Sequence, residues 1–207
     1  MYPEKSLFTK VIMNILGATL TSVSVLSNGF VLAAIARFKS LRTVPNILIA
    51  NLAMVDLLHA AVNLPFHMIS NSEASWYRGQ TLAIVTAFLS RVFAILNLAS
   101  MLAVLANVFL AITFDLKYLA WKTKKKAMLC VVLIWLTSLV VTSLGSIPLL
   151  NINLAEARVR DYRAEFYKQG KYFVGTSFAF SVLCVGGLSF LTTCAIKKNK
   201  KKVSVKL

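Results

Sequence analysis

Charged residues are scarce in this sequence, and acidic ones are the scarcest. Only 14% of the 207 residues are charged, whereas 58% are hydrophobic and the mean hydropathy is +0.73. A soluble domain of this length cannot hide so much apolar surface from water. The shortage of charge therefore excludes a soluble globular protein and predicts a membrane protein.

The charge that is present is unbalanced, with 23 lysines and arginines against 7 aspartates and glutamates and a formal net charge of +16. A basic balance can indicate nucleic-acid binding. Here, however, the basic residues lie between apolar runs and at the C-terminus, where a cytoplasmic anionic lipid surface attracts them. We therefore expect membrane lipid as a partner and no nucleic acid.

Cysteines and catalytic motifs are also few. Cys130, Cys184 and Cys194 all lie inside apolar stretches, where a thiol behaves as a small hydrophobe, so we expect no disulfide. The sequence contains no phosphate-binding P-loop, no glycine-rich dinucleotide turn, no His-Glu-x-x-His and no nucleophile with an evident base. We predict that the chain is not an enzyme and carries no organic cofactor.

Five apolar runs are each long enough to cross a bilayer, which takes about 20 helical residues. They cover residues 11–36, 46–69, 81–114, 127–150 and 173–196, and a basic tail, 197–207, follows them. The third run exceeds the usual bilayer thickness and should tilt strongly or extend beyond the membrane as a helix. Residues 117–126 are interpreted as a basic turn. The sequence predicts one all-α membrane domain, 1–207, built as a bundle of five transmembrane helices.

The distribution of lysine and arginine predicts the orientation of this bundle, because short cytoplasmic loops carry an excess of both. With the N-terminus outside, the inner segments hold fourteen of them and the outer segments eight. The fourteen are Arg37, Lys39, Arg42, Lys117, Lys122, Lys124, Lys125, Lys126, Lys197, Lys198, Lys200, Lys201, Lys202 and Lys206. We expect an extracellular N-terminus and a cytoplasmic C-terminus.

The second run carries the first candidate functional residue. Asp56 lies near its middle and Pro65 near its end. A carboxylate at the centre of an apolar helix is costly unless it faces the interior of the bundle, so Asp56 should face inward. His59 follows one turn later on the same face; a metal pair or proton relay is conceivable, but packing is the simpler interpretation.

Several short motifs occur in a fixed order from Asn28 to Trp135. They are Ser27-Asn28-Gly29, the stretch Asn51-Leu52-Ala53-Met54-Val55-Asp56-Leu57, Pro65, Trp76-Tyr77-Arg78-Gly79, Phe114-Asp115-Leu116-Lys117-Tyr118 and Trp135. In sequence and gapless spacing they resemble the signatures of rhodopsin-like (class A) G-protein-coupled receptors. The resemblance implies that the five runs correspond to the first five helices of a seven-helix receptor.

The sequence also departs from that family. Asn107-Val108-Phe109 stands where the family has Asp-Arg-Tyr, Ala83 replaces the usual third-span cysteine, and Ser90 replaces the aspartate that aminergic members use. No segment carries the Cys-Trp-x-Pro and Asn-Pro-x-x-Tyr motifs of the sixth and seventh spans. We therefore expect a divergent receptor truncated to five spans.

The resemblance assigns roles to particular residues. Asp56, with Asn28 and Asn97, would form a polar core that either binds a sodium ion or holds three helices together by hydrogen bonds. Asn51 would meet the Trp135 indole, and Pro65 and Trp76 would be structural signatures. Ser90 and Arg91 would lie on the ligand side, where Arg91 either snorkels outward, pairs with an acid or meets an anionic ligand. Asn107, Val108 and Phe109 would face the G protein.

The function implied is a plasma-membrane receptor that passes a signal from an extracellular ligand to a heterotrimeric G protein. Because the third-span arginine is replaced by Val108, we expect weak signalling by the chain alone. The alternative is a non-signalling truncated receptor that binds a full-length receptor and modulates it. A transporter is less favoured, since we find neither paired broken helices nor a second intramembrane charge cluster.

Overall fold

The computed structural model describes residues 7–65, 80–150, 182–183, 186–187 and 189–197. In this part of the chain the regular structure is helical and no strand occurs. The elements are α1 (Leu7–Arg37), the 3-10 helix η1 (Lys39–Leu41), α2 (Val44–Leu58), the π-helix η2 (His59–Asn63), α4 (Gln80–Trp121) and α5 (Lys124–Leu150). Residues 189–197 are also helical. The predicted all-α membrane bundle is confirmed.

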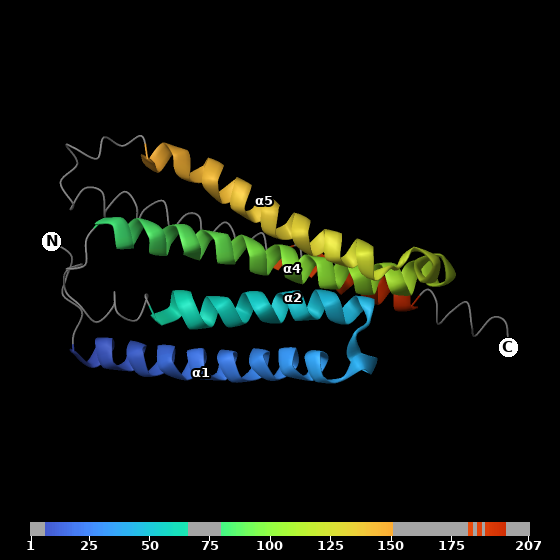
Figure 1. Ribbon diagram of the computed structural model, residues 1–207, viewed down its shortest axis with the longest axis horizontal. Helices are drawn as coiled ribbons and strands as arrows, with labels where there is room; N and C mark the ends of the chain where they lie inside the picture. The colour runs from blue at the N-terminus through green and yellow to red at the C-terminus, as the bar shows by residue number, and fades with distance from the viewer. Residues whose placement is uncertain (1–6, 66–79, 151–181, 184–185, 188, 198–207) are drawn as a thin grey trace.

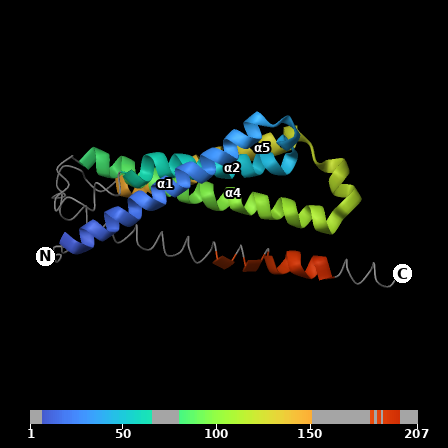
Figure 2. The same ribbon diagram turned by 90° about the horizontal axis from the view of Figure 1, so that it is seen from below.

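Four helical segments are long and apolar enough to cross a membrane: Leu7–Arg37, Val44–Asn63, Phe88–Phe114 and Lys124–Gly145. In Figure 1 they lie side by side, and successive helices run in opposite directions. Figure 2 shows α1 crossing the bundle obliquely. The predicted fifth run lies partly outside the described residues, and residues 66–69 of the second run do so entirely.

Helix α4 is the longest element, and its length follows from its composition. Its 42 residues include neither glycine nor proline, the two residues that most often end a helix. At 1.5 Å per residue it spans about 63 Å, roughly twice the thickness of a bilayer core. The predicted basic turn over 117–126 is therefore wrong for most of its length, since only Lys122 and Thr123 lie outside α4 and α5.

The C-terminal part of α4 is bent. The Tyr118 hydroxyl donates a hydrogen bond of 2.8 Å to Asn107 Oδ1, eleven residues earlier. Along a straight helix these residues would be about 16 Å apart, too far for the two side chains to meet. The axis must curve between them, and Figure 2 shows the last turns of α4 leaving the line of the rest.

We expect Tyr118→Phe to loosen this end of α4. The substitution removes one hydrogen bond, worth about 1 kcal/mol, so amide hydrogen exchange over residues 113–121 should accelerate about fivefold. Exchange in the middle of α4 should not change. Trp121→Phe is the matched control, because Trp121 is exposed on the same segment. Unchanged exchange in the Tyr118 variant would show that the bend does not depend on this bond.

Helix α2 widens into η2 just before a proline. Pro65 has no N–H to give to the carbonyl four residues back, and its ring crowds that carbonyl. In η2 the N–H of Leu64 bonds instead to the carbonyl of His59, five residues back. The wider turn accommodates the proline without ending the helix, and it brings Asn63 into the interior, where 1% of its surface remains exposed.

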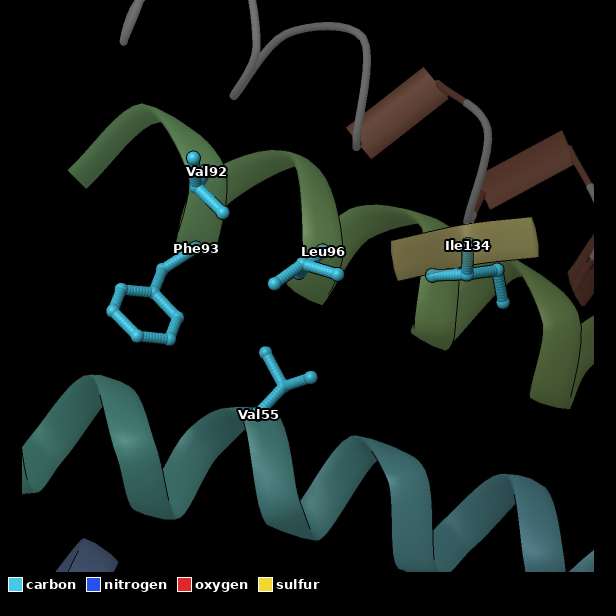
Figure 3. Packing of buried hydrophobic residues seen from close by; sticks show 5 residues of the cluster. All are labelled: Val55, Val92, Phe93, Leu96 and Ile134. Carbon is cyan, nitrogen blue, oxygen red and sulfur yellow. The ribbon is translucent and has the colours of Figure 1, made fainter. Parts of the chain in front are cut away.

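The apolar core lies where α2, α4 and α5 meet. Val55 of α2 packs with Val92, Phe93 and Leu96 of α4 and with Ile134 of α5. Figure 3 shows the Val55 side chain directed from α2 toward α4, opposite Leu96. Helix α1 has no buried residue. The functional candidates of α2 and α4 thus lie on the helices that form this buried core.

Candidate functional site

Among the described residues, a row of three side-chain hydrogen bonds joins α2 and η2 to α4. Asn51 bonds to Ser100, Asp56 to Asn97, and Asn63 to Ser90. Because the helices are antiparallel, the residue numbers of the bonded partners increase on the first helix and decrease on α4 from one bond to the next. We call this row of three bonds the polar ladder. In a membrane, where helices gain little from the hydrophobic effect between them, such bonds help to fix which helix faces meet.

The first bond of the ladder along the chain is centred on Asn51. Its amide nitrogen donates to Ser100 Oγ at 2.7 Å, and its oxygen accepts from Trp135 Nε1 at 2.9 Å. Asn51 and Ser100 are both buried. The predicted contact between Asn51 and Trp135 is therefore present. Ser100 was not predicted, although its position one turn after Asn97 on the same helix was a signal for it.

The middle rung joins Asn97, whose side-chain amide donates, to Asp56 Oδ1. Both side chains are half-buried. Asn28, the third residue predicted for this polar core, instead donates to the carbonyl oxygen of Ser24 at 3.0 Å and to its hydroxyl at 3.3 Å, one turn back in α1. The structure thus brings Asp56 and Asn97 together and leaves Asn28 bonded within its own helix.

The third bond of the ladder, between Ser90 and Asn63, was not predicted. The Ser90 hydroxyl lies 3.0 Å from Asn63 Oδ1 and 2.7 Å from the carbonyl oxygen of Thr86. Asn63 and Thr86 are buried and Ser90 is half-buried, as is its neighbour Arg91. The sequence did not predict the role of Asn63, because its inward position depends on the wide turn of η2. A ligand that engaged Ser90 would have to compete with Asn63.

Removing the bond between Ser90 and Asn63 should have a small effect on the unfolding free energy. Ser90→Ala loses the bond between helices but also frees the carbonyl of Thr86, to which the hydroxyl is alternatively bonded. We expect a loss of about 0.6 kcal/mol in unfolding free energy, the typical value for such a bond in a membrane. Denaturation with sodium dodecyl sulfate measures it, with Ser27→Ala as control because the Ser27 hydroxyl bonds within α1. A loss several times larger would contradict this expectation.

His59 packs against an aromatic ring. Its imidazole centroid lies 5.6 Å from that of Phe93, with the rings tilted by 49°. This is the geometry of an aromatic contact, in line with the packing interpretation. The part of the chain that the structure describes contains no group of three or more His, Cys, Asp or Glu residues that could hold a metal ion.

The residues predicted to face the G protein, Asn107, Val108 and Phe109, lie in the C-terminal half of α4. Asn107 accepts the hydrogen bond from Tyr118, Phe109 is half-buried and Val108 is exposed. An exposed valine offers no charge to a partner. Of the remaining candidates, Pro65 follows η2 and is the last described residue before the gap at 66–79, and Trp76 lies outside the described residues.

Comparison with known sequences decides the family. The model of the family described as "7 transmembrane receptor (rhodopsin family)" matches residues 27–198. The chain belongs to this family. The predicted resemblance to rhodopsin-like receptors is confirmed. The protein is a receptor-like, multi-pass membrane protein, and its family is generally non-enzymatic.

Curated relatives in this family are similar over part of their length. Melanopsin-B of Xenopus laevis is 36% identical over 118 residues, which are 57% of this chain and 22% of the relative. Trace amine-associated receptor 13c of Danio rerio is 30% identical over 127 residues, or 61% of this chain and 37% of the relative. 5-hydroxytryptamine receptor 1B of Vulpes vulpes is 31% identical over 130 residues, which are 63% of this chain and 33% of the relative. The chain thus spans well under half of each relative.

Within this rhodopsin-family chain, the ladder lies where the sequence motifs are densest. Asn51 and Asp56 both belong to the second-span signature, and Trp135 is the fourth-span tryptophan. Their hydrogen bonds join α2 to α4 and α5. Three residues of the family pattern that this chain keeps, Asn51, Asp56 and Trp135, therefore take part in bonds between helices.

Proposed function

We propose that this chain acts at the plasma membrane, with its N-terminus outside and its C-terminus in the cytoplasm, in passing the signal of an extracellular ligand toward a heterotrimeric G protein. The observation that carries the proposal is the polar ladder, in which receptor-signature residues of α2 engage α4 and α5. The excess of lysine and arginine in the inner segments supports the orientation.

On the ligand side, the chemistry of the proposed site favours a neutral or anionic ligand. The relatives include a trace amine-associated receptor and a 5-hydroxytryptamine receptor. Ser90, however, offers a hydroxyl where a carboxylate would be needed to pair with an ammonium group. The adjacent Arg91 is cationic and half-buried, and a guanidinium binds carboxylates and phosphates well.

At the inner end, the residues favour a second candidate function. Val108 stands where the family has an arginine and is exposed on α4, while Asn107 is bonded to Tyr118. A receptor switches through an element that both ligand and effector bias, and the arginine usually serves in that element. We infer that the chain alone activates G proteins weakly, and that it binds a full-length receptor and modulates it.

For Asp56 we propose the structural role rather than a sodium site. A hard cation is held by oxygen lone pairs, whereas Asn97 presents an N–H to the Asp56 carboxylate. Asn28 is bonded to Ser24 instead. Asn97 therefore meets the Asp56 carboxylate as a hydrogen-bond donor, and its amide hydrogen already occupies one carboxylate oxygen.

One experiment separates the two functions. The full chain is expressed in cells with G-protein dissociation sensors, alone and together with an epitope-tagged full-length rhodopsin-family receptor. We expect at most a weak agonist-dependent response from the chain alone, co-purification with the tagged receptor, and a changed surface level of that receptor. An unrelated multi-pass protein of similar length is the control. Strong agonist-dependent activation by the chain alone would overturn the modulator role, and the absence of both activation and co-purification would overturn both functions.

A further inference from the structure

One end of the bundle gathers exposed cations from three separate segments of the chain. We call this surface the basic end; its described members are Arg37, Lys39, Arg42, Lys122, Lys124, Lys125, Lys126 and Lys197, all exposed. Figures 1 and 2 both place the end of α1, η1, the link from α4 to α5 and residues 189–197 at the same end of the long axis. The sequence of segments 37–42, 115–126 and 197–207 contains one acidic residue, Asp115.

Exposed aromatic side chains alternate with these cations. Phe38 lies between Arg37 and Lys39 and is 56% exposed, and Trp121 precedes Lys122 and is 64% exposed. Aromatic rings concentrate at the headgroup level of a bilayer, and lysine and arginine near helix ends reach from there toward the phosphates. This pairing of ring and cation places the basic end at the depth of lipid headgroups rather than free in the aqueous phase.

Two of the cations are held in position. The Arg42 guanidinium donates to the carbonyl oxygen of Ala36 at 2.6 Å, at the end of α1. Lys122 Nζ lies 5.4 Å from the centroid of the Tyr118 ring, within the range of a cation–π contact. Neither contact neutralises the charge. Both therefore present a positioned cation to an external anion.

Three further lysines occupy a position that is unfavourable for folding. Lys124, Lys125 and Lys126 form the first turn of α5, which contains no acidic residue. The N-terminal end of a helix is already partly positive, so cations there destabilise it. Thr123 Oγ1 accepts the N–H of Lys126 at 3.3 Å but supplies no charge. Anions in front of this turn would offset the repulsion.

We propose that the basic end binds anionic phospholipid headgroups of the leaflet that it faces. The interleaved rings enter the boundary of the acyl region, and the eight cations contact the phosphates. This binding would come in addition to any effect of the same charges on orientation, and it does not depend on G-protein coupling.

The test uses the purified full chain in a neutral detergent, where orientation in a bilayer plays no part. Native mass spectrometry measures the binding of phosphatidylserine, phosphatidylinositol 4,5-bisphosphate and phosphatidylcholine. Each cation near an anionic surface contributes about fivefold to binding. We therefore expect Lys124→Gln with Lys125→Gln and Lys126→Gln to weaken binding of both anionic lipids by at least about fivefold, the contribution of one cation, and leave phosphatidylcholine unchanged.

Two controls and a second measurement keep the result unambiguous. The matched triple replacement by arginine should retain anionic-lipid binding, and Lys10→Gln, near the start of α1 at the opposite end (Figure 1), should not alter it. The glutamine triple should be at least as stable as wild type in neutral detergent, because it removes repulsion at the start of α5. Equal binding of phosphatidylserine and phosphatidylcholine by the wild type, or unchanged anionic-lipid binding by the glutamine triple, would overturn the proposal.

Discussion

Asn97→Leu should be among the most destabilising single substitutions in this bundle, with a loss of about 3 kcal/mol in unfolding free energy. Asn97 supplies the hydrogen-bond donor to Asp56 in the middle of the interface between α2 and α4. Removing it leaves a half-buried carboxylate without that donor at membrane depth, which is far more costly than losing a neutral bond. Unfolding with sodium dodecyl sulfate in mixed micelles measures the change.

The matched control removes both members of the pair. Replacing both partners by apolar residues avoids the unsatisfied group and can be nearly neutral. Asp56→Leu combined with Asn97→Leu should therefore be more stable than Asn97→Leu alone, by about 2 kcal/mol. If the double variant is instead less stable than the single one, the two residues do not depend on each other and the middle rung is misassigned.

The same pair bears on sodium. If Asn97 satisfies Asp56, exchanging sodium chloride for choline chloride should leave the stability of the wild-type chain unchanged, because no cation is needed to compensate the carboxylate. A clear stabilisation by sodium that disappears in Asp56→Leu would favour the ion site over the structural role.

Asn51→Leu should have the second large effect, a loss of about 2 kcal/mol in unfolding free energy. Asn51 makes two side-chain bonds, one to Ser100 and one to Trp135. Each is worth about 0.6 kcal/mol in a membrane protein, and the half-buried Trp135 is then left with an indole N–H that has lost this acceptor. Met54→Leu is the control, since Met54 lies on the exposed face of the same helix.

A double-mutant cycle locates the origin of that loss. Trp135→Phe removes the indole N–H but keeps an aromatic ring, so combining it with Asn51→Leu should cost less than the sum of the two single losses. The difference between that sum and the loss in the double variant measures the free energy of the bond between Asn51 and Trp135. Strict additivity would mean that the bond between Asn51 and Trp135 contributes nothing, and that the loss comes from the bond to Ser100 and from packing.

The sequence predicted the parts of this fold that depend on composition and on motifs. The length of the apolar runs determined where membrane helices lie, and the signatures around Asn51 and Asp56 identified the helix that the others contact. The bond between Asn51 and Trp135 was accessible because the resemblance linked two positions that are 84 residues apart. Asn97 was accessible for the same reason.

Other features depend on local geometry that periodicity does not show. Asn63 faces Ser90 after a π-helical turn, and a regular 3.6-residue period gives no indication of such a turn. Tyr118 reaches Asn107 because α4 bends. The basic turn was predicted from charge, but lysine is a good helix former and no glycine or proline interrupts α4 before Trp121. Asn28 was placed with Asp56 by analogy, whereas its amide found a nearer acceptor in Ser24.

The register of the polar ladder is the central claim, and crosslinking tests it most directly. With Cys130, Cys184 and Cys194 replaced by alanine, Asn63→Cys is combined either with Ser90→Cys or, as control, with Asn97→Cys. Ser90 lies opposite Asn63, with 3.0 Å between their side-chain oxygens, whereas Asn97 is two turns further along α4, about 10 Å away. A short bifunctional thiol reagent should link the first pair and not the second, as measured by mass spectrometry of the joined peptides. Crosslinking of the second pair instead of the first would contradict the ladder and the helix register built on it.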